Sequence, residues 1–215
     1  MRAVLAIELS AEPSWIAVRA GETTVERSFE GERGRALIHE VDRLLEDAGM
    51  ERPDLAGILV GVGPGWYTGL RIACAAARTL GYALDVPVGG VSSFAAAALV
   101  APADTEVHLV VDAYRNEVYH AAYRRERDRV VPLAEPGVYA RADRAVPVPA
   151  DAVLVGDPEL VEVPVTALAD QVQPRASALL ELVTADPADW AQCEAVTAAD
   201  PLYLRAAARR PSAAR

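Results

Sequence analysis

A glycine-rich stretch has the clearest potential for chemistry, and it reads Gly61-Val62-Gly63-Pro64-Gly65-Trp66-Tyr67-Thr68-Gly69-Leu70-Arg71. It joins an apolar run to a helical pattern, an order that exposes backbone N–H groups at the positive end of a helix and favours an anion such as phosphate. The spacing contains neither a G-x-x-x-x-G-K-[ST] pattern nor a G-x-G-x-x-G pattern that opens the helix. The pattern therefore favours a tight structural turn, in which glycines allow positive φ and close packing, over a phosphate site.

Two carboxylates, Glu8 and Asp112, stand where strands are expected to end. In a cleft between lobes, such a pair could hold Mg²⁺ or position a water, as a small ATPase or a carbamoyl-type transferase requires. The simpler interpretation is that each is a strand-end or turn carboxylate. All 21 basic residues are arginine, so phosphate groups would need arginine or backbone donors rather than a lysine.

Other reactive side chains show no spacing that indicates nucleophilic catalysis or metal binding. These residues are Cys74, Cys193, His39, His108, His120, Ser10, Ser92 and Ser93. The cysteines form no C-x-x-C pair and the histidines no ligand pattern, so the sequence predicts no metal site. The serines lie outside any G-x-S-x-G elbow, which leaves a protease with little support.

Charge and hydropathy exclude further classes of protein. The net charge of −10 disfavours direct binding of nucleic acid by this chain alone. No run approaches the roughly 18 uncharged apolar residues that a membrane span needs. The start of the chain is apolar for only a few residues before Glu8, which predicts a strand rather than a signal peptide, and a cytoplasmic protein.

Hydrophobic periodicity predicts the elements that would position these residues. In chain order they are strands over 3–9, 15–19 and 23–29, a helix over 34–48, a strand over 57–61, a helix over 70–84, a strand over 86–88 and a helix opened by Ser92 and Ser93. Three strands joined by short turns, followed by alternating helix and strand, predict an α/β fold with mixed sheets flanked by helices.

A second, smaller lobe is expected after a linker at 101–104, because strand patterns restart at 106–112 and 117–123. The predicted division is 1–102 for the first lobe and 103–215 for the second lobe with a C-terminal segment. Weak patterns predict strands over 152–155 and 161–165 and a helix over 175–184. The helix over 70–84 is apolar on nearly every side, so either this chain's own layers or another subunit must cover it.

Three blocks resemble the TsaB (YeaZ) family. The glycine loop is similar to its Gly-Pro-Gly-x-x-Thr-Gly-Leu-Arg hallmark, the block from Asp112 to Tyr119 to its Asp-Ala-Arg-x-x-Glu-Val-Tyr, and Pro201 to Arg205 to its Pro-x-Tyr-x-Arg. The resemblance runs over most of the chain. The motif positions are Gly63, Pro64, Gly65, Thr68, Gly69 and Arg71 in the loop, and Asp112, Glu117 and Tyr119 in the second lobe.

The resemblance implies a two-lobed, actin-like ATPase fold with ribonuclease H-like architecture that has lost its own catalysis. It implies an accessory subunit in threonylcarbamoyl modification of the tRNA adenosine next to the anticodon. The expected partners are a larger, metal-carrying TsaD-like transferase and a small TsaE-like ATPase, with a homodimer possible without TsaD. No cofactor of its own is expected, although ATP or ADP could bind at a complex interface, and tRNA would be reached only through the complex.

Pairing in that family uses helices of the first lobe, so the resemblance and the apolar helix together predict a partner interface. Its expected residues are Leu37, Ile38, Val41, Leu45, Ile72, Ala73, Ala76, Ala77 and Leu80. The chain departs from the family pattern at Glu8-Leu9-Ser10, where Asp-Thr-Ser is usual, at Arg33-Gly34-Arg35, where a His-Ser pair is common, and at Trp66-Tyr67, where Ser-Phe is usual. These changes weaken the case for nucleotide binding and leave open a divergent paralogue that acts as a small ATPase or carbamoyl-type transferase.

Overall fold

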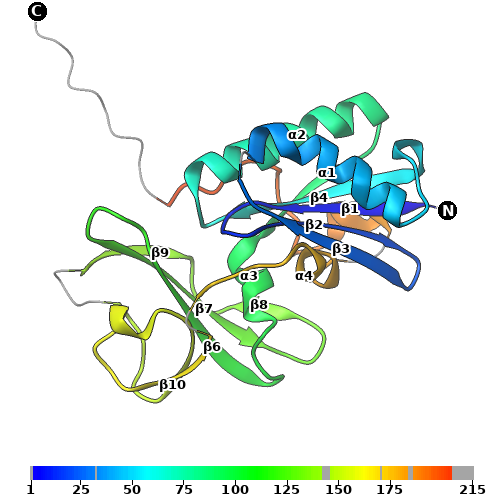
Figure 1. The fold of residues 1–215 in the computed structure, drawn as a ribbon. Helices are drawn as coiled ribbons and strands as arrows, with labels where there is room; N and C mark the ends of the chain where they lie inside the picture. Colours follow the sequence, from blue (N-terminus) through cyan, green and yellow to red (C-terminus); the bar gives the residue numbers. More distant parts are fainter. Residues whose placement is uncertain (1, 32, 142–145, 170, 184–185, 205–215) are drawn as a thin grey trace, which may run out of the picture.

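Each of two lobes is built around one β-sheet in the computed structural model, which describes residues 2–31, 33–141, 146–169, 171–183 and 186–204 (Figure 1). The first sheet has the order β3-β2-β1-β4-β5. Its strands are β1 (Ala3–Glu8), β2 (Ser14–Ala20), β3 (Thr23–Phe29), β4 (Leu55–Gly63) and β5 (Val88–Ser92). The pairs β1–β2 and β2–β3 are antiparallel, whereas β1–β4 and β4–β5 are parallel. This is the mixed sheet that the sequence predicts.

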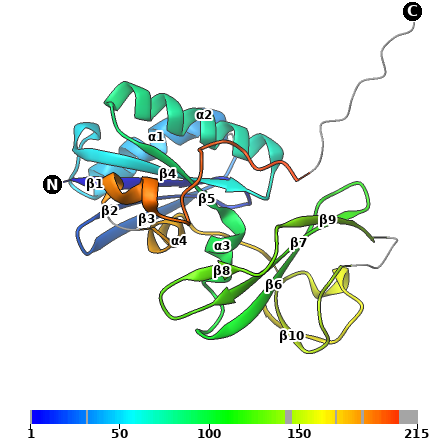
Figure 2. The ribbon, with the colours of Figure 1, turned by 180° about the vertical axis from the view of Figure 1, so that it is seen from behind.

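Helices cover both faces of the first sheet, which explains why β1 and β4 are buried along their whole length. The long helices α1 (Arg33–Asp47) and α2 (Tyr67–Leu84) lie side by side on one face (Figure 1). The short α4 (Ala176–Glu181) and the 3₁₀ helix η4 (Pro187–Gln192) cover the other face (Figure 2). Among the described residues, no helix is long and apolar enough to cross a membrane.

The C-terminal part of the chain returns to the first lobe. Leu179, Leu180 and Trp190 pack with Val4 and Leu59 of the first sheet. Gly90 and Thr197 then exchange two backbone hydrogen bonds of 2.8 Å, which covers the edge strand β5. The division expected from sequence places residues 103–215 in the second lobe, but the structure packs residues 176–183 and 186–204 against the first sheet. A C-terminal segment therefore covers one face and the β5 edge of the first sheet, although no local sequence pattern assigns this segment to the first lobe.

The second sheet has the order β11-β10-β6-β7-β8, with β9 also paired to β7. Its strands are β6 (Thr105–Asp112), β7 (Glu117–Arg125), β8 (Val130–Pro132), β9 (Gly137–Ala140), β10 (Ala152–Gly156) and β11 (Val165–Ala169). The helix α3 (Ser93–Ala98) joins the lobes, and its Phe94 is buried with Leu109 and Tyr123 of the second sheet. Two short 3₁₀ helices, η1 (Arg52–Asp54) and η3 (Pro158–Leu160), precede β4 and follow β10.

Two strand predictions differ from the structure. The strand expected at 86–88 lies at Val88–Ser92, because residues 85 and 86 belong to the end of the helix: Asp85 caps α2 with a left-handed φ of 54°, and the Val86 N–H bonds back to the Gly81 carbonyl. The strand expected at 161–165 is wrong over most of its length, since the chain there follows η3 and β11 begins at Val165. The short β8 and β9 were not predicted, because both are defined by pairing with β7 rather than by a pattern of their own.

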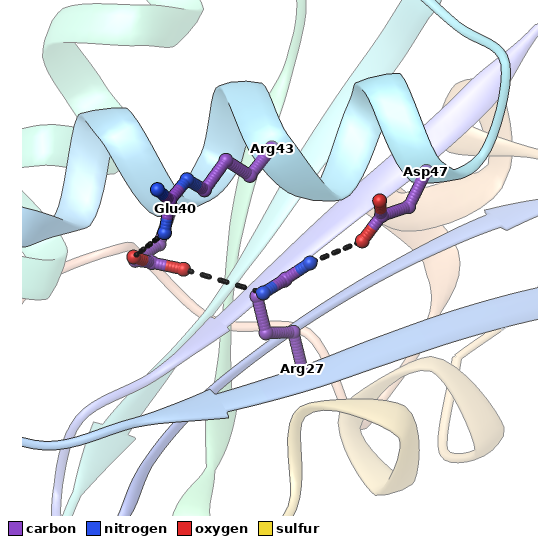
Figure 3. A network of polar contacts seen from close by, with 4 residues as sticks. All are labelled: Arg27, Glu40, Arg43 and Asp47. Atoms are coloured by element: carbon purple, nitrogen blue, oxygen red, sulfur yellow. Dashed lines mark hydrogen bonds and ion pairs between the residues drawn. The ribbon is translucent and has the colours of Figure 1, made fainter.

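An ion-pair network fixes α1 to the edge of the first sheet (Figure 3). Arg27 of β3 pairs with Asp47 near the end of α1, and its Nη1 atom lies 3.8 Å from Glu40 Oε2. Glu40 also pairs with Arg43 at 3.4 Å, one turn along the helix. Exposed pairs of this kind contribute about 0–1 kcal/mol each, so the buried leucines of α1 supply most of its stabilisation.

Two histidines are buried in the second sheet. His108 Nδ1 of β6 lies 3.0 Å from His120 Nε2 of β7, so one ring donates a hydrogen bond and the other accepts it. Burial lowers both pKa values, that of His120 to about 4, with a further contribution from the neighbouring His108. Glu106, whose Oε1 is 3.3 Å from His108 Nε2, partly offsets the lowering at His108. The folded protein therefore holds this pair neutral.

The histidine pair predicts loss of stability in acid. The unfolded chain binds protons near the ordinary pKa of 6.5, whereas the folded chain does not do so until about pH 4 at His120. The free energy of unfolding should fall as the pH drops from about 6.5 towards 4, and His120→Gln should reduce that slope. Urea unfolding at several pH values measures the free energy of unfolding and its slope against pH. His39→Gln, on the exposed side of α1, is the matched control. An equal reduction of the slope in His39→Gln would contradict the prediction.

Candidate functional site

A single buried carboxylate holds together the segments around the glycine loop. Glu8, the last residue of β1, is 1% exposed. Its Oε1 accepts a hydrogen bond of 2.7 Å from the Ser10 backbone N–H, and its Oε2 accepts one of 2.7 Å from the Ser93 hydroxyl. The Ser93 oxygen in turn accepts a bond of 3.1 Å from the Gly63 N–H. The end of β1, the glycine loop and the start of α3 are therefore joined through one side chain.

Burial raises the pKa of Glu8, and the hydrogen bonds from Ser10 and Ser93 offset part of that rise. The carboxylate fills the space beside Gly61, where an added Cβ would lie 1.9 Å from Oε2. Glu8 therefore points into the protein beneath the loop and does not line the crevice that contains Asp112. The two carboxylates considered for Mg²⁺ binding occupy different environments. Nothing in the sequence around Ser93 signals its part in this network.

The glycine loop packs directly on the turn that follows β1. An added Cβ on Gly69 would lie 2.0 Å from the Leu9 carbonyl oxygen, and one on Gly65 would lie 2.5 Å from Ser10 Cβ. The Trp66 N–H donates a 2.7 Å hydrogen bond to the Ser10 carbonyl. Gly63 has a φ of +103°, a conformation that side chains rarely adopt. These contacts explain the spaced glycines by close packing, as the structural-turn interpretation expects.

The remaining positions of the loop motif lie around the start of α2. Pro64 is buried, whereas Thr68 is exposed within the first turn of the helix. Arg71 donates a 2.8 Å hydrogen bond to the Tyr67 hydroxyl, and its guanidinium carbon is 5.4 Å from the centre of that ring. Tyr203, near the end of the described chain, also contacts Tyr67. The centres of the two rings are 5.0 Å apart and their planes are tilted by 32°.

A crevice of about 430 Å³ lies where the two lobes face each other. The first lobe contributes the turn after β1 and the start of α2, and the second contributes the end of β6, the turn after it and part of β7. The lining residues are Ser10, Ala11, Glu12, Gly65, Trp66, Tyr67, Val111, Asp112, Ala113, Tyr114 and Tyr119. The loop motif and the second-lobe motif, which lie far apart in the sequence, thus meet at this crevice.

The turn between β6 and β7 shapes the second-lobe side of the crevice. Tyr114, Arg115 and Asn116 have φ values of 59°, 56° and 64°, an unusual run of left-handed residues. Asp112 Oδ1 accepts a 2.7 Å hydrogen bond from the Tyr114 N–H, which supports this conformation. Asp112 and Tyr119 line the crevice, whereas Glu117 is half-buried and its carbonyl accepts a hydrogen bond from the Ala113 N–H.

Most residues expected at a partner interface lie in this chain's own core. The buried members are Leu37, Val41, Leu45, Ala73, Ala77 and Leu80. Their side chains contact the first sheet because α1 and α2 lie against it, so they are not available to a partner in this structure. Ile72 and Ala76 are partly buried, and Ile38 is 37% exposed. The apolar pattern of α2 thus reflects packing within the chain at most positions.

The structure does not place the candidate serine nucleophiles beside a histidine. Ser93 binds Glu8, Ser92 accepts a hydrogen bond from the Ala95 N–H at the start of α3, and the histidine pair lies in the second sheet. Burial raises the pKa of the Cys74 thiol to about 11. Across the described parts of the chain, no three His, Cys, Asp or Glu side chains come together in a way that could hold a metal ion.

Comparison with known proteins gives these features a context. A family model described as TsaD, tRNA N6-adenosine threonylcarbamoyltransferase, matches residues 33–165. The structure of YeaZ from Pseudomonas aeruginosa superposes with a TM-score of 0.80 at 29% identity, covering 95% of this chain and 100% of that one. This chain belongs to the TsaB (YeaZ) family. It therefore has the two-lobed actin-like, ribonuclease H-like fold that the sequence motifs imply.

Two relatives of the family are similar over part of their length. The tRNA threonylcarbamoyladenosine biosynthesis protein TsaB of Bacillus subtilis is 40% identical over 96 residues, which are 43% of this chain and 42% of that protein. An uncharacterized protein of Mycobacterium leprae is 36% identical over 168 residues, 78% of this chain and 43% of that protein. The matched segments thus cover less than half the length of each of these two relatives.

The close packing of the family's glycine loop predicts that Gly69→Ala destabilises the fold. The new Cβ would meet backbone at Leu9, so strands must shift, at a cost of about 1–3 kcal/mol in the free energy of unfolding. Gly34→Ala in α1 is the control. The Cβ added there would meet only Ile72 of α2, at 3.7 Å, and alanine favours a helix. Urea unfolding compares the two variants, and equal stabilities would contradict the packing argument.

The buried Glu8 predicts an opposite dependence on pH from that of the histidines. The folded state binds the Glu8 proton more tightly than the unfolded state, in which the group titrates near 4.5. The stability of the unchanged protein relative to Glu8→Gln should therefore decline as the pH rises above about 4.5, by on the order of 1 kcal/mol per pH unit at most. Urea unfolding from pH 4.5 upward measures this. Glu46→Gln, exposed on α1, should show no such trend, and a flat difference for Glu8→Gln would refute the prediction.

Proposed function

We propose that this chain is a non-catalytic scaffold subunit in threonylcarbamoyladenosine biosynthesis. In this role it binds a larger TsaD-like threonylcarbamoyltransferase, with a TsaE-like ATPase joining the assembly, and the complex modifies the tRNA adenosine next to the anticodon. In this proposal the modification of tRNA takes place in the cytoplasm, and this chain contacts tRNA only through the complex. Family membership supports the pathway, since relatives named TsaB are tRNA threonylcarbamoyladenosine biosynthesis proteins, and the matching family model is named for the transferase.

The observation that carries the scaffold role is the outer surface of α1 and α2. The two helices lie side by side and present their outer sides away from the sheet (Figure 1). That surface includes Ile38, which is 37% exposed, and Tyr82, which is 92% exposed. Gly34 of α1 and Ala75 of α2 are small and exposed, which permits close approach of partner helices. Apolar and small side chains on paired helices favour a helical partner surface.

The alternative of a small ATPase or carbamoyl-type transferase depends on Glu8 and Asp112 acting together. Glu8 is enclosed beneath the glycine loop and hydrogen-bonded to Ser10 and Ser93, whereas Asp112 lines the crevice. The Trp66 amide at the start of α2 is bonded to Ser10. The geometry therefore favours the scaffold over this alternative.

The scaffold role is tested by purifying the tagged chain gently from its own organism and identifying stoichiometric partners by mass spectrometry. The expected result is a TsaD-like subunit in equal amount, with threonylcarbamoyladenosine in bulk tRNA falling when the chain is depleted. Recovery of the chain alone or only with itself, with unchanged modification, would overturn the proposal. ATP hydrolysis by the isolated chain that is lost in Asp112→Asn would favour the alternative.

Charge placed on the outer surface of α1 and α2 should break the complex without unfolding the subunit. Ile38→Glu and Ala75→Glu introduce a carboxylate at exposed helical positions, so we expect at least a tenfold loss of affinity for the TsaD-like partner and a nearly unchanged melting temperature. Calorimetric titration and thermal unfolding measure the two effects.

Two variants control this experiment. Val100→Glu alters an apolar residue that is 59% exposed after α3, outside the surface of α1 and α2, and should bind the partner normally. Ala77→Glu buries a carboxylate at a position that is 0% exposed, and should instead unfold the subunit. Normal partner binding by Ile38→Glu and Ala75→Glu together would place the interface elsewhere.

A further inference from the structure

We infer that the crevice between the lobes is a binding site for an organic cation with a planar guanidinium head. The site is separate from the outer surface of α1 and α2, and does not depend on the scaffold role. Its volume of about 430 Å³ is within the range of pockets that hold small ligands. The inference stands on which side chains the two lobes bring together there.

Aromatic rings from both lobes line the crevice. The first lobe supplies Trp66 and Tyr67, which are 44% and 55% exposed, and the second supplies Tyr114, which is 68% exposed, and Tyr119. Exposed aromatic rings gathered at a concave site present π-faces that attract a cation, and the Tyr67 ring already carries the guanidinium of Arg71. The left-handed turn at Tyr114 carries its ring into this lining.

The charge of the lining is acidic. Glu12 comes from the turn after β1 and Asp112 from the end of β6, and none of the described lining residues is basic. Arg141 lies outside the lining, with its Nη1 atom 4.0 Å from Asp112 Oδ2, the outer limit of an ion pair. A carboxylate beside aromatic faces suits a guanidinium, whose N–H groups bind the carboxylate while its plane stacks on a ring.

The same chain already uses this type of contact elsewhere. The Arg175 guanidinium carbon lies 4.5 Å from the centre of the Trp15 ring while the group pairs with Glu26. Arg71 lies 5.4 Å from the centre of the ring of Tyr67, which is itself a lining residue. The Arg175 contact shows that an aromatic ring with an adjacent carboxylate holds an arginine side chain in this fold.

A phosphate-bearing ligand fits the crevice less well. A polyphosphate needs several cationic or N–H donors, whereas the described lining offers two carboxylates. At the start of α2 the Trp66 N–H is already bonded to Ser10, and the glycines there pack on Leu9 and Ser10. The Trp66 N–H, one of the donors that would attract phosphate, is therefore occupied by the protein.

Calorimetric titration of the purified chain tests the cation site. The probe is N-acetyl-L-arginine methylamide, and the matched neutral ligand is the corresponding citrulline derivative. We expect saturable one-to-one binding of the arginine compound, at least tenfold tighter than that of citrulline, accompanied by a change in Trp66 fluorescence that Trp66→Phe abolishes. A Gly-Arg-Gly peptide compared with agmatine identifies whether the guanidinium comes from a polypeptide or from a small molecule.

Two substitutions locate the site. Asp112→Asn keeps an oxygen that can accept from the Tyr114 N–H and should weaken binding of the arginine probe at least tenfold, and Glu12→Gln should weaken it as well. Glu46→Gln makes the same charge change on α1 and should have no effect. Circular dichroism confirms folding, and Glu12→Gln tests the site if Asp112→Asn fails to fold. Equal binding of citrulline, absence of saturation, or binding of adenosine or ATP in place of arginine would overturn the inference.

Discussion

The hydrogen-bonded carboxylate of Glu8 is the constraint on which the centre of the molecule depends. It accepts from Ser10 and Ser93, while Ser93 also accepts from Gly63. A buried carboxylate is costly unless its oxygens are satisfied, and the bonds from Ser10 and Ser93 satisfy both oxygens of Glu8. They set the turn after β1, the glycine loop and the start of α3 relative to one another, and α3 leads directly into the second lobe.

The glycine loop and the C-terminal segment complete the first lobe around that centre. The loop packs on Leu9 and Ser10 at distances that only glycine permits, and this places α2 over the sheet. On the opposite face, Trp190 and its neighbours fill the core, and Thr197 pairs with Gly90 of the edge strand. An otherwise exposed strand edge is thereby covered, which protects it from pairing with other chains.

Two separate surfaces result from this architecture. The core-facing sides of α1 and α2 are used within the chain, whereas Ile38 and Tyr82 on these helices remain exposed. The meeting of the lobes forms a crevice of aromatic and acidic residues, including Trp66, Tyr114 and Asp112. The first surface is where we propose that the partner binds, and the second is the site that we infer for a cationic ligand.

Sequence by itself determined the strands with strong apolar patterns, the helices α1 and α2, the mixed first sheet and the family motifs, because these depend on local periodicity and glycine spacing. It did not determine that residues 176–183 and 186–204 return to the first lobe, or that β8 and β9 pair with β7, since such contacts are non-local. It also did not separate the buried from the exposed side of α2 or show Glu8 beneath the loop. Burial and the meeting of distant segments are decided by packing, and only the tertiary structure contains that information.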